Sequence, residues 1–325
     1  MDLTAEFWEP VFTVVALLFA LVSGTNDGAT LLALGARASR MPLLGATLIL
    51  TVAVVVAPLV LGTSVASTFL DRLVSFGSQL RPALLVAVTA SLATIALLGW
   101  RGLPTSLTVA LLGGLVGVGV GQGLEVHWRT VGVVILIALA TPAIGLIMAF
   151  LINRIALSLD VRGRVSRLLE RVHVAVFSVQ CLAYGTNDGQ KMLAVFVAAT
   201  GATGAEAVVS DPRSLLIGLF FALGTLLGLR RYAKSVVLDV FPVRPANAVA
   251  AEIGAAVSVL GTGLLGSPVS TTQTVVTSVI GSGMHEGVRR VRWEHALQIG
   301  LAWVYTFPMT FSLGVAFAIV WGWVS

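Results

Sequence analysis

Long apolar runs alternate with short polar segments along the whole chain. Most of these runs approach the roughly 20 residues that a helix needs to cross a bilayer. They predict membrane segments at 10–36, 42–70, 82–100, 103–121, 130–152, 174–204, 214–229, 246–264, 267–283 and 296–323. The pattern therefore predicts an all-α polytopic membrane protein with about ten membrane segments.

The composition excludes large classes of soluble protein. Hydrophobic residues make up 57% of the chain and charged residues 11%, whereas about a quarter of a typical soluble domain is charged. So few polar residues cannot cover a water-facing surface, which excludes a cytosolic enzyme. The net charge of +5 comes from 18 Arg and 2 Lys that lie between apolar runs, so it reflects topology and not affinity for nucleic acid.

Cysteine and histidine usage gives no reason to expect a cofactor. Cys181 is the single cysteine, which excludes an internal disulfide and a Cys-based metal site. The four histidines, His127, His173, His285 and His295, lie in or beside polar connectors. Their spacing is not that of metal ligands. An enzyme would need a nucleophile with a base, or a metal cluster, and no predicted span carries a histidine. We expect no enzyme, and no bound group beyond a coupling ion.

One long polar stretch divides the chain into two membrane halves, 1–152 and 174–325. The linker between them, 153–173, carries five arginines, and such positive segments face the cytoplasm. Five crossings per half then place both termini outside. No signal peptide is expected, because the first eight residues contain two acidic residues and no Lys or Arg. We expect a multi-pass protein of the plasma membrane that contacts lipid, with homodimer formation left open.

An internal repeat relates the two halves. Gly24–Gly28 has the sequence Gly-Thr-Asn-Asp-Gly, which recurs identically at Gly185–Gly189, 161 residues later. Pro104 begins Pro-Thr-Ser-Leu-Thr, and Pro268 begins Pro-Val-Ser-Thr-Thr at an offset of 164. An odd number of crossings per half forces the second copy to insert upside down. Such inverted repeats are typical of secondary transporters, whose substrate site lies near the membrane midplane.

Ionisable residues are rare inside the apolar runs. Asp27, Asp188, Glu252 and Lys191 lie well within them, and a charge at the bilayer centre costs at least about 2.5–3.5 kcal/mol. The Gly-flanked Thr-Asn-Asp segments predict two broken helices, whose side-chain and backbone oxygens would suit Na⁺ or a proton. Simple helix capping is the alternative. Glu252 is expected to face the interior near the repeat interface, as a cation ligand or proton carrier.

Lys191 follows Asp188 by one helical turn on the same face. We expect it to pair with Asp188 or with the substrate. The alternative is a lysine whose long stem lets it snorkel to the membrane interface.

The two Pro–Ser/Thr motifs predict an anion site. Each follows a Gly-rich break, at Gly102 and Gly266, and opens an apolar run that is short for a span and suits one arm of a re-entrant hairpin. A helix start with Pro, Ser and Thr offers free N–H groups and hydroxyl donors to phosphate or sulfate. Hydroxyl packing between helices is the alternative.

These motifs resemble those of the inorganic phosphate transporter (PiT) family, whose two signatures are similar to Gly-Ala-Asn-Asp and Pro-Val-Ser-Thr-Thr-His. The resemblance covers nearly the whole chain and includes Thr-Asn-Asp-Gly-Gln-Lys at 186–191 and Ala-Ala-Glu at 250–252. The chain departs from the family pattern at three positions. Leu107 stands where the family usually has Thr, and Val109 and Gln273 stand where it usually has His.

The resemblance implies a shared substrate and cation site between the two halves. The expected substrate-binding residues are Asp27, Asp188, Ser106, Thr108, Ser270, Thr271, Thr272, Gln273 and Lys191. The expected cation-binding residues are Thr25, Asn26, Asp27, Thr186, Asn187, Asp188 and Glu252.

These observations predict cation-coupled uptake of an inorganic anion. Entry of an anion against an inside-negative potential costs about 2.3 kcal/mol per charge per 100 mV, and two aspartates would also repel it. A coupling cation, Na⁺ or H⁺, that binds first at Asp27 and Asp188 would remove both obstacles. Phosphate is favoured over sulfate because near neutral pH it can keep a proton and donate it to a carboxylate. A sulfate permease and, less favoured, an anion channel are the alternatives.

Overall fold

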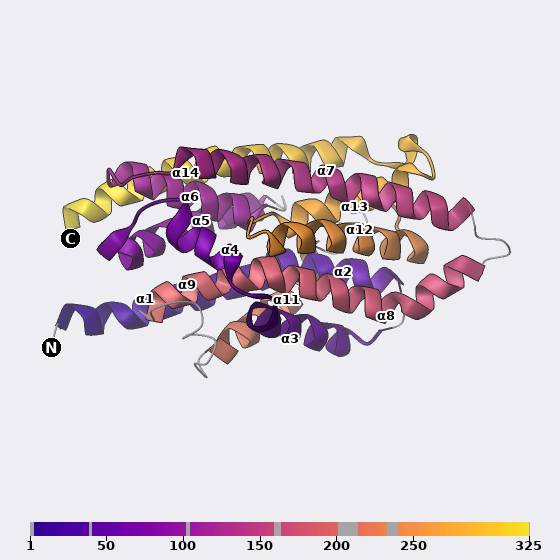
Figure 1. Ribbon diagram of the computed structural model, residues 1–325, viewed down its shortest axis with the longest axis horizontal. Coiled ribbons are helices and arrows are strands. Elements are labelled where there is room, and N and C mark those ends of the chain that lie inside the picture. Colours follow the sequence, from indigo (N-terminus) through magenta and orange to yellow (C-terminus); the bar gives the residue numbers. More distant parts are fainter. Residues whose placement is uncertain are drawn as a thin grey trace.

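The computed structural model describes residues 3–38, 41–101, 105–158, 164–200, 214–232 and 240–324. The ordered elements in this part of the chain are helices, and the longest of them follow the long axis of the molecule (Figure 1). The first half contains α1 (Leu3–Ser23), α2 (Ala29–Ala38), α3 (Leu43–Leu61), α4 (Ser64–Ser67), α5 (Leu80–Trp100), α6 (Leu107–Gly121) and α7 (Trp128–Ser158). The second half contains α8 (Arg164–Tyr184), α9 (Gln190–Thr200), α11 (Ser214–Tyr232), α12 (Pro245–Leu264), α13 (Thr271–Met284) and α14 (Trp293–Val324).

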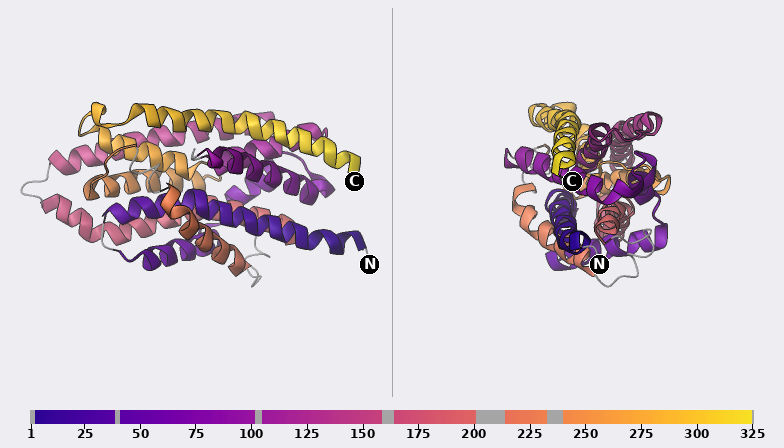
Figure 2. Two further views of the ribbon diagram at one scale, coloured as in Figure 1. Left: turned by 180° about the vertical axis from the view of Figure 1, so that it is seen from behind. Right: turned by 90° about the vertical axis from the view of Figure 1, so that its left-hand side faces the viewer.

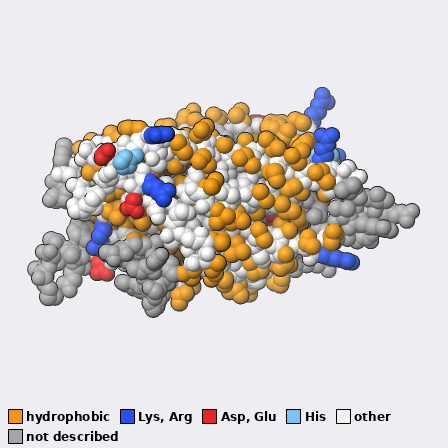
Figure 3. Space-filling view, viewed as in Figure 1, with side chains coloured by type: hydrophobic (Ala, Val, Ile, Leu, Met, Phe, Trp, Pro, Cys, Tyr) orange, Lys and Arg blue, Asp and Glu red, His pale blue; other side chains and the backbone are white. Residues whose placement is uncertain are grey.

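The structure is that of a multi-pass membrane protein. Six stretches of the described chain are long and apolar enough to cross a bilayer: Glu9–Arg37, Leu43–Leu61, Gly77–Trp100, Trp128–Ala156, Pro245–Leu264 and Trp293–Gly322. On the face drawn in Figure 3, apolar side chains cover the middle of the molecule, and the described charged side chains gather toward its two ends. The predicted all-helical class is confirmed.

Three predicted boundaries differ from the observed ones. The run expected at 42–70 is interrupted at Gly62, whose φ of +89° ends α3, and short helical turns follow it. Most of the predicted linker 153–173 is helical, because α7 extends to Ser158 and α8 begins at Arg164. Residues 159–163, with Arg162, and the expected helix start at Gly102 and Pro104 lie outside the described residues.

The chain ends and the middle of the chain lie at opposite ends of the molecule. α1 begins and α14 ends at one end, on the left in Figure 1, whereas α7 ends and α8 begins at the other. The helices α6 and α13 start beside each other, since the Thr108 hydroxyl donates to the Val269 carbonyl at 2.8 Å. From that point they run toward opposite ends of the molecule (Figures 1 and 2).

Glycines bring the helices that carry the Gly-Thr-Asn-Asp-Gly segments into close backbone contact with their neighbours. A Cβ at Gly24 would lie 2.0 Å from the Phe221 carbonyl oxygen, and one at Gly224 would lie 1.9 Å from the Leu21 carbonyl oxygen. In the second half, a Cβ at Gly185 would lie 2.3 Å from the Ala53 carbonyl oxygen. Close approach through small residues is a common way for helices to associate in membranes.

We predict that Gly224→Ala destabilises the protein. The added methyl group collides with the backbone of α1, which cannot give way as a flexible side chain would, and overpacking of this kind costs about 1–3 kcal/mol. Gly300→Ala in α14 is the matched control, because a Cβ there meets nothing within 4 Å. Fluorescence-monitored thermal unfolding of the purified proteins should show a lower melting temperature for the first variant alone. Equal melting temperatures would contradict the close contact.

Candidate functional site

Two π-helical turns carry the repeated Gly-Thr-Asn-Asp-Gly segments. The first, Gly24–Gly28 (η1), joins α1 to α2, and the second, Gly185–Gly189 (η5), joins α8 to α9. Residues on both sides keep right-handed helical dihedrals, and the Ala29 N–H donates to the Gly24 carbonyl, five residues back. The prediction of broken helices is therefore wrong. A π turn inserts one extra residue while the backbone groups stay hydrogen-bonded, and such turns are frequent at functional sites.

The asparagines of the two turns hold equivalent points of two other helices. Asn26 Nδ2 donates to the Thr105 carbonyl at 2.8 Å, just before α6 begins. Asn187 Nδ2 donates to the Val269 carbonyl at 2.6 Å, just before α13. Ser106 and Ser270, the next residues along the chain, cap these helices by accepting from the N–H groups of Val109 and Gln273. The two π turns thus anchor the starts of α6 and α13 in the same way.

The two aspartates meet at the first turn of α13. The Thr272 hydroxyl donates to Asp27 Oδ1, and the hydroxyl of the adjacent Thr271 donates to Asp188 Oδ2. Asp27 and Asp188 are 3% and 1% exposed, so both carboxyl groups are shut off from solvent. Two segments separated by 161 residues in sequence therefore place their carboxylates against one helical turn.

Lys191 lies at the centre of this cluster. Its Nζ donates to Asp188 Oδ1 at 2.7 Å, to the Val269 carbonyl at 2.8 Å and to the Thr108 hydroxyl. The residue is fully buried, so it does not snorkel to the membrane interface. We name Asp27, Asp188, Lys191, Thr108, Thr271 and Thr272 the aspartate–lysine cluster.

The hydroxyl groups of two expected cation ligands bond to the backbone and not to the aspartate–lysine cluster. The Thr25 hydroxyl donates to the Leu21 carbonyl at 2.9 Å, and the Thr186 hydroxyl donates to the Leu182 carbonyl at 2.8 Å. Both bonds stay within the helix that carries the threonine. A Cβ at Gly263 of α12 would approach the Thr186 side chain to 3.2 Å, so this threonine packs against α12.

Gln273 belongs to a different environment. Its side chain lines an apolar cavity of about 540 Å³ between α6, α7, α13 and α14, together with Val109, Leu139 and Trp303. The two positions at which the chain departs from the family's histidines therefore face the same apolar space. Among the described residues, no hydrogen bond joins the Gln273 side chain to Asp27 or Asp188, so its expected place beside the substrate stays a prediction.

Glu252 forms a second buried ionisable pair. Its Oε1 lies 3.1 Å from His173 Nε2, and both side chains are fully buried between α8 and α12. His173 precedes Asp188 by 15 residues, which corresponds to roughly 22 Å along a helix. Glu252 therefore lies apart from the aspartate–lysine cluster. His173 was expected in or beside a polar connector, whereas it lies within α8, which begins ten residues earlier than the predicted segment at 174.

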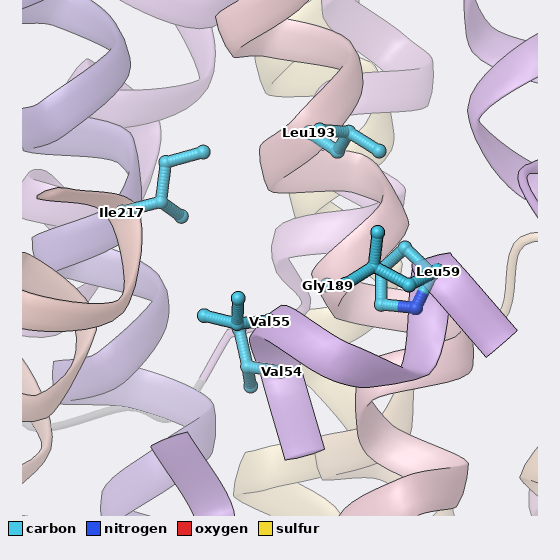
Figure 4. A pocket seen from close by; sticks show the side chains of 7 residues that line it. Val54, Val55, Leu59, Gly189, Leu193 and Ile217 are labelled. Carbon is cyan, nitrogen blue, oxygen red and sulfur yellow. The ribbon is translucent and has the colours of Figure 1, made fainter. Parts of the chain in front are cut away.

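A small apolar cavity of about 30 Å³ lies beside the second π turn (Figure 4). Val54, Val55 and Leu59 of α3, Leu193 of α9 and Ile217 of α11 surround it. Gly189 lets α3 come this close, since a Cβ there would lie 2.6 Å from the Val54 carbonyl oxygen. With an apolar lining and room for about one water molecule, this cavity does not suit an anion.

The fold and the buried charges define a polytopic membrane protein with an ionisable centre where its two halves meet. Residues 23–161 and 156–314 match the model of the phosphate transporter family, and the chain belongs to that family. A probable low-affinity inorganic phosphate transporter of Rhizobium meliloti (strain 1021) is 33% identical over 222 residues, 64% of this chain and 64% of that protein. The chain thus spans just under two thirds of that relative.

Two further comparisons cover nearly the whole chain. A probable low-affinity inorganic phosphate transporter of Mycobacterium leprae (strain TN) is 27% identical over 319 residues, which is 94% of this chain and 76% of that protein. A solved structure described as the sodium-dependent phosphate transporter matches with a TM-score of 0.79 at 19% identity. It covers 98% of this chain and 100% of its own, so the two share a fold.

Proposed function

We propose that the protein is a secondary active transporter that takes up inorganic phosphate together with a coupling cation, Na⁺ or H⁺. The observation that carries this proposal is the burial of two carboxylates from distant segments against one helical turn. A structural scaffold would not need such a pair, because each buried charge is costly unless it is matched. The relatives' names support phosphate as the cargo, and none of those described above is named for sulfate.

The anion would bind at the meeting point of α6 and α13. The positive ends of both helix dipoles converge there, and hydroxyl groups of Thr108, Thr271 and Thr272 lie within reach of the carboxylates. The negative charge of Asp27 and Asp188 would repel phosphate until a cation binds. Cation binding first, followed by phosphate, therefore fits the charge of the site.

Alternating access would follow from the arrangement of the two halves. We propose that α5 with α6 and α12 with α13 are re-entrant hairpins of two inverted repeats, 1–152 and 174–325, joined by a cytoplasmic linker at 153–173. The opposite directions of α6 and α13 and the equivalent contacts of Asn26 and Asn187 support this arrangement. The aspartate–lysine cluster is buried from solvent, so one half must move against the other before an anion can enter or leave.

We predict that Asp27→Asn abolishes cation-driven accumulation of phosphate. The substitution keeps the volume of the side chain but removes the charge that would hold the cation. The measurement is uptake of radiolabelled phosphate into proteoliposomes, with Na⁺ and pH gradients imposed separately. Asp71→Asn, at an exposed aspartate, is the control and should behave as wild type. Normal accumulation by a folded Asp27→Asn protein would refute the proposed cation site.

The identity of the anion is tested by competition in the same proteoliposomes. Unlabelled phosphate in excess should suppress uptake of labelled phosphate, and the same excess of sulfate should leave most of it. The reason is that phosphate can donate a proton to an aspartate that no cation has neutralised, whereas sulfate cannot. A transporter blocked far better by sulfate would be a sulfate permease. Flux that never accumulates phosphate against its gradient, judged by counterflow, would indicate a channel.

We propose that Glu252 and His173 act as a separate proton-carrying pair. The two side chains contact each other at 3.1 Å and lie apart from the proposed anion site. A proton could therefore bind there without competing with the substrate. Glu252→Gln should therefore weaken uptake driven by a pH gradient, while phosphate binding at fixed pH is kept. Binding of labelled phosphate by the detergent-solubilised protein separates the two effects. A variant that retains its full dependence on the cation gradient would refute this role.

A further inference from the structure

The two halves of the chain differ at the residue that follows each repeated aspartate by three positions. Thr30 holds this position after Asp27, and its hydroxyl donates to the Asn26 carbonyl at 2.8 Å within its own helix. Lys191 holds it after Asp188 and reaches out of its helix to Thr108 and Val269. The repeats are therefore alike in backbone but unlike in charge at this point.

The Lys191 nitrogen lies between the Thr108 hydroxyl and the Asp188 carboxylate, which the repeat would otherwise bring into direct contact. Thr272 in α13 donates its hydroxyl directly to Asp27. Thr108 occupies the corresponding place in α6, 164 residues earlier, so the repeat would direct its hydroxyl to Asp188. Instead Lys191 Nζ lies against both, 2.7 Å from Asp188 Oδ1 and hydrogen-bonded to the Thr108 hydroxyl.

The surroundings of this nitrogen are those of a bound cation. An ammonium group has three N–H donors, and the three acceptors here are a carboxylate, a hydroxyl and the Val269 carbonyl. Carboxylate, hydroxyl and carbonyl oxygens are also the ligands that a hard metal cation prefers. A tethered ammonium group thus stands where the repeat would otherwise form a second ion site.

The Asp27 side has no ammonium group in the corresponding place, where Thr30 bonds within its own helix. Asn26 Oδ1 and the Thr105 hydroxyl oxygen are buried and have no hydrogen-bond partner in the described part of the chain. On the Asp188 side, Asn187 Oδ1 accepts from the Val269 N–H at 3.1 Å, and Val269 has no hydroxyl where Thr105 has one. Open oxygens beside one aspartate and an ammonium beside the other make the two ion positions unequal.

We infer that Lys191 is a tethered counter-ion that replaces one coupling cation, so that a single mobile cation binds in the cluster, beside Asp27. This inference rests on the proposed transport function. The charge balance supports it, since two carboxylates and one ammonium leave one negative charge, which one monovalent cation cancels before the anion arrives. Removal of the ammonium would leave two negative charges and would create a second position for a mobile cation.

The test is the number of cations that move with each phosphate. Proteoliposomes hold a fixed gradient of the cation that drives wild-type uptake, at zero membrane potential, and the phosphate gradient that halts net flux is measured. Lys191→Thr, which gives the second half the residue of the first, should couple one more cation than wild type. For a tenfold cation gradient, this raises the balancing phosphate gradient by roughly tenfold. Thr30→Val, a buried hydroxyl removed without a change of charge, is the matched control and should keep the wild-type number.

A second measurement covers variants that bind phosphate but no longer move it. Binding of labelled phosphate to Lys191→Thr and Lys191→Gln in detergent should be weaker than wild type at low cation concentration and recover at high concentration. Recovery is the signature of a replaced cation, because added cations cannot substitute for a direct anion ligand or a packing contact. Thermal unfolding of each variant confirms that the protein measured is folded.

Two results would overturn the inference. One is an unchanged number of coupled cations in Lys191→Thr, and the other is phosphate binding by both variants that no cation concentration restores. Neither result affects the proposed transport function. That function fails on a different observation, namely wild-type protein whose phosphate uptake responds to neither a Na⁺ nor a pH gradient.

Discussion

Burial of charge is the constraint on which the rest of this structure depends. Asp27, Asp188 and Lys191 lie together in the interior of a membrane protein, where each would be expensive alone. They are tolerable because every one of them is matched by an opposite charge or by a hydroxyl donor. The helices that supply these partners must therefore be held in fixed register, and the close glycine contacts and asparagine bonds provide that register.

The π turns place polar side chains within an apolar membrane environment while the backbone stays hydrogen-bonded. An unwound segment would leave backbone N–H and carbonyl groups without partners at membrane depth, at a cost of several kcal/mol each. In η1 the Ala29 N–H still finds the Gly24 carbonyl, so the chain remains helical. The extra residue in the turn shifts the register of the helix and supplies consecutive asparagine and aspartate side chains to the site. Glycines at both ends of the turn let α11 approach it closely, with its backbone at Gly24 and with its side chains at Gly28.

The near-equivalence of the two halves makes their differences informative. Asn26 and Asn187 hold the starts of α6 and α13 in the same manner. The two halves differ instead in the hydroxyl groups and charges at other equivalent positions. Leu107 supplies no hydroxyl where Thr271 does, and Lys191 supplies a charge where Thr30 does not. A cluster built from two similar halves can thus carry an asymmetric set of charges without any change in its backbone plan.

The sequence by itself determined the apolar segments, the repeat and the rare ionisable residues within the spans. These are local properties, because the length of an apolar run and the identity of a motif do not depend on neighbouring helices. It also placed Asp27, Asp188, Thr271 and Thr272 in one candidate site through the resemblance of their motifs to those of a known family.

Only the tertiary structure decided where the side chains point. It turned Thr25 and Thr186 back to their own helices, placed Gln273 in an apolar cavity and paired Glu252 with a histidine expected in or beside a polar connector. It also joined Lys191 to both halves at once. These outcomes depend on the rotation and register of each helix against its neighbours. Backbone contacts between residues far apart in the chain set that register, and no local pattern records them.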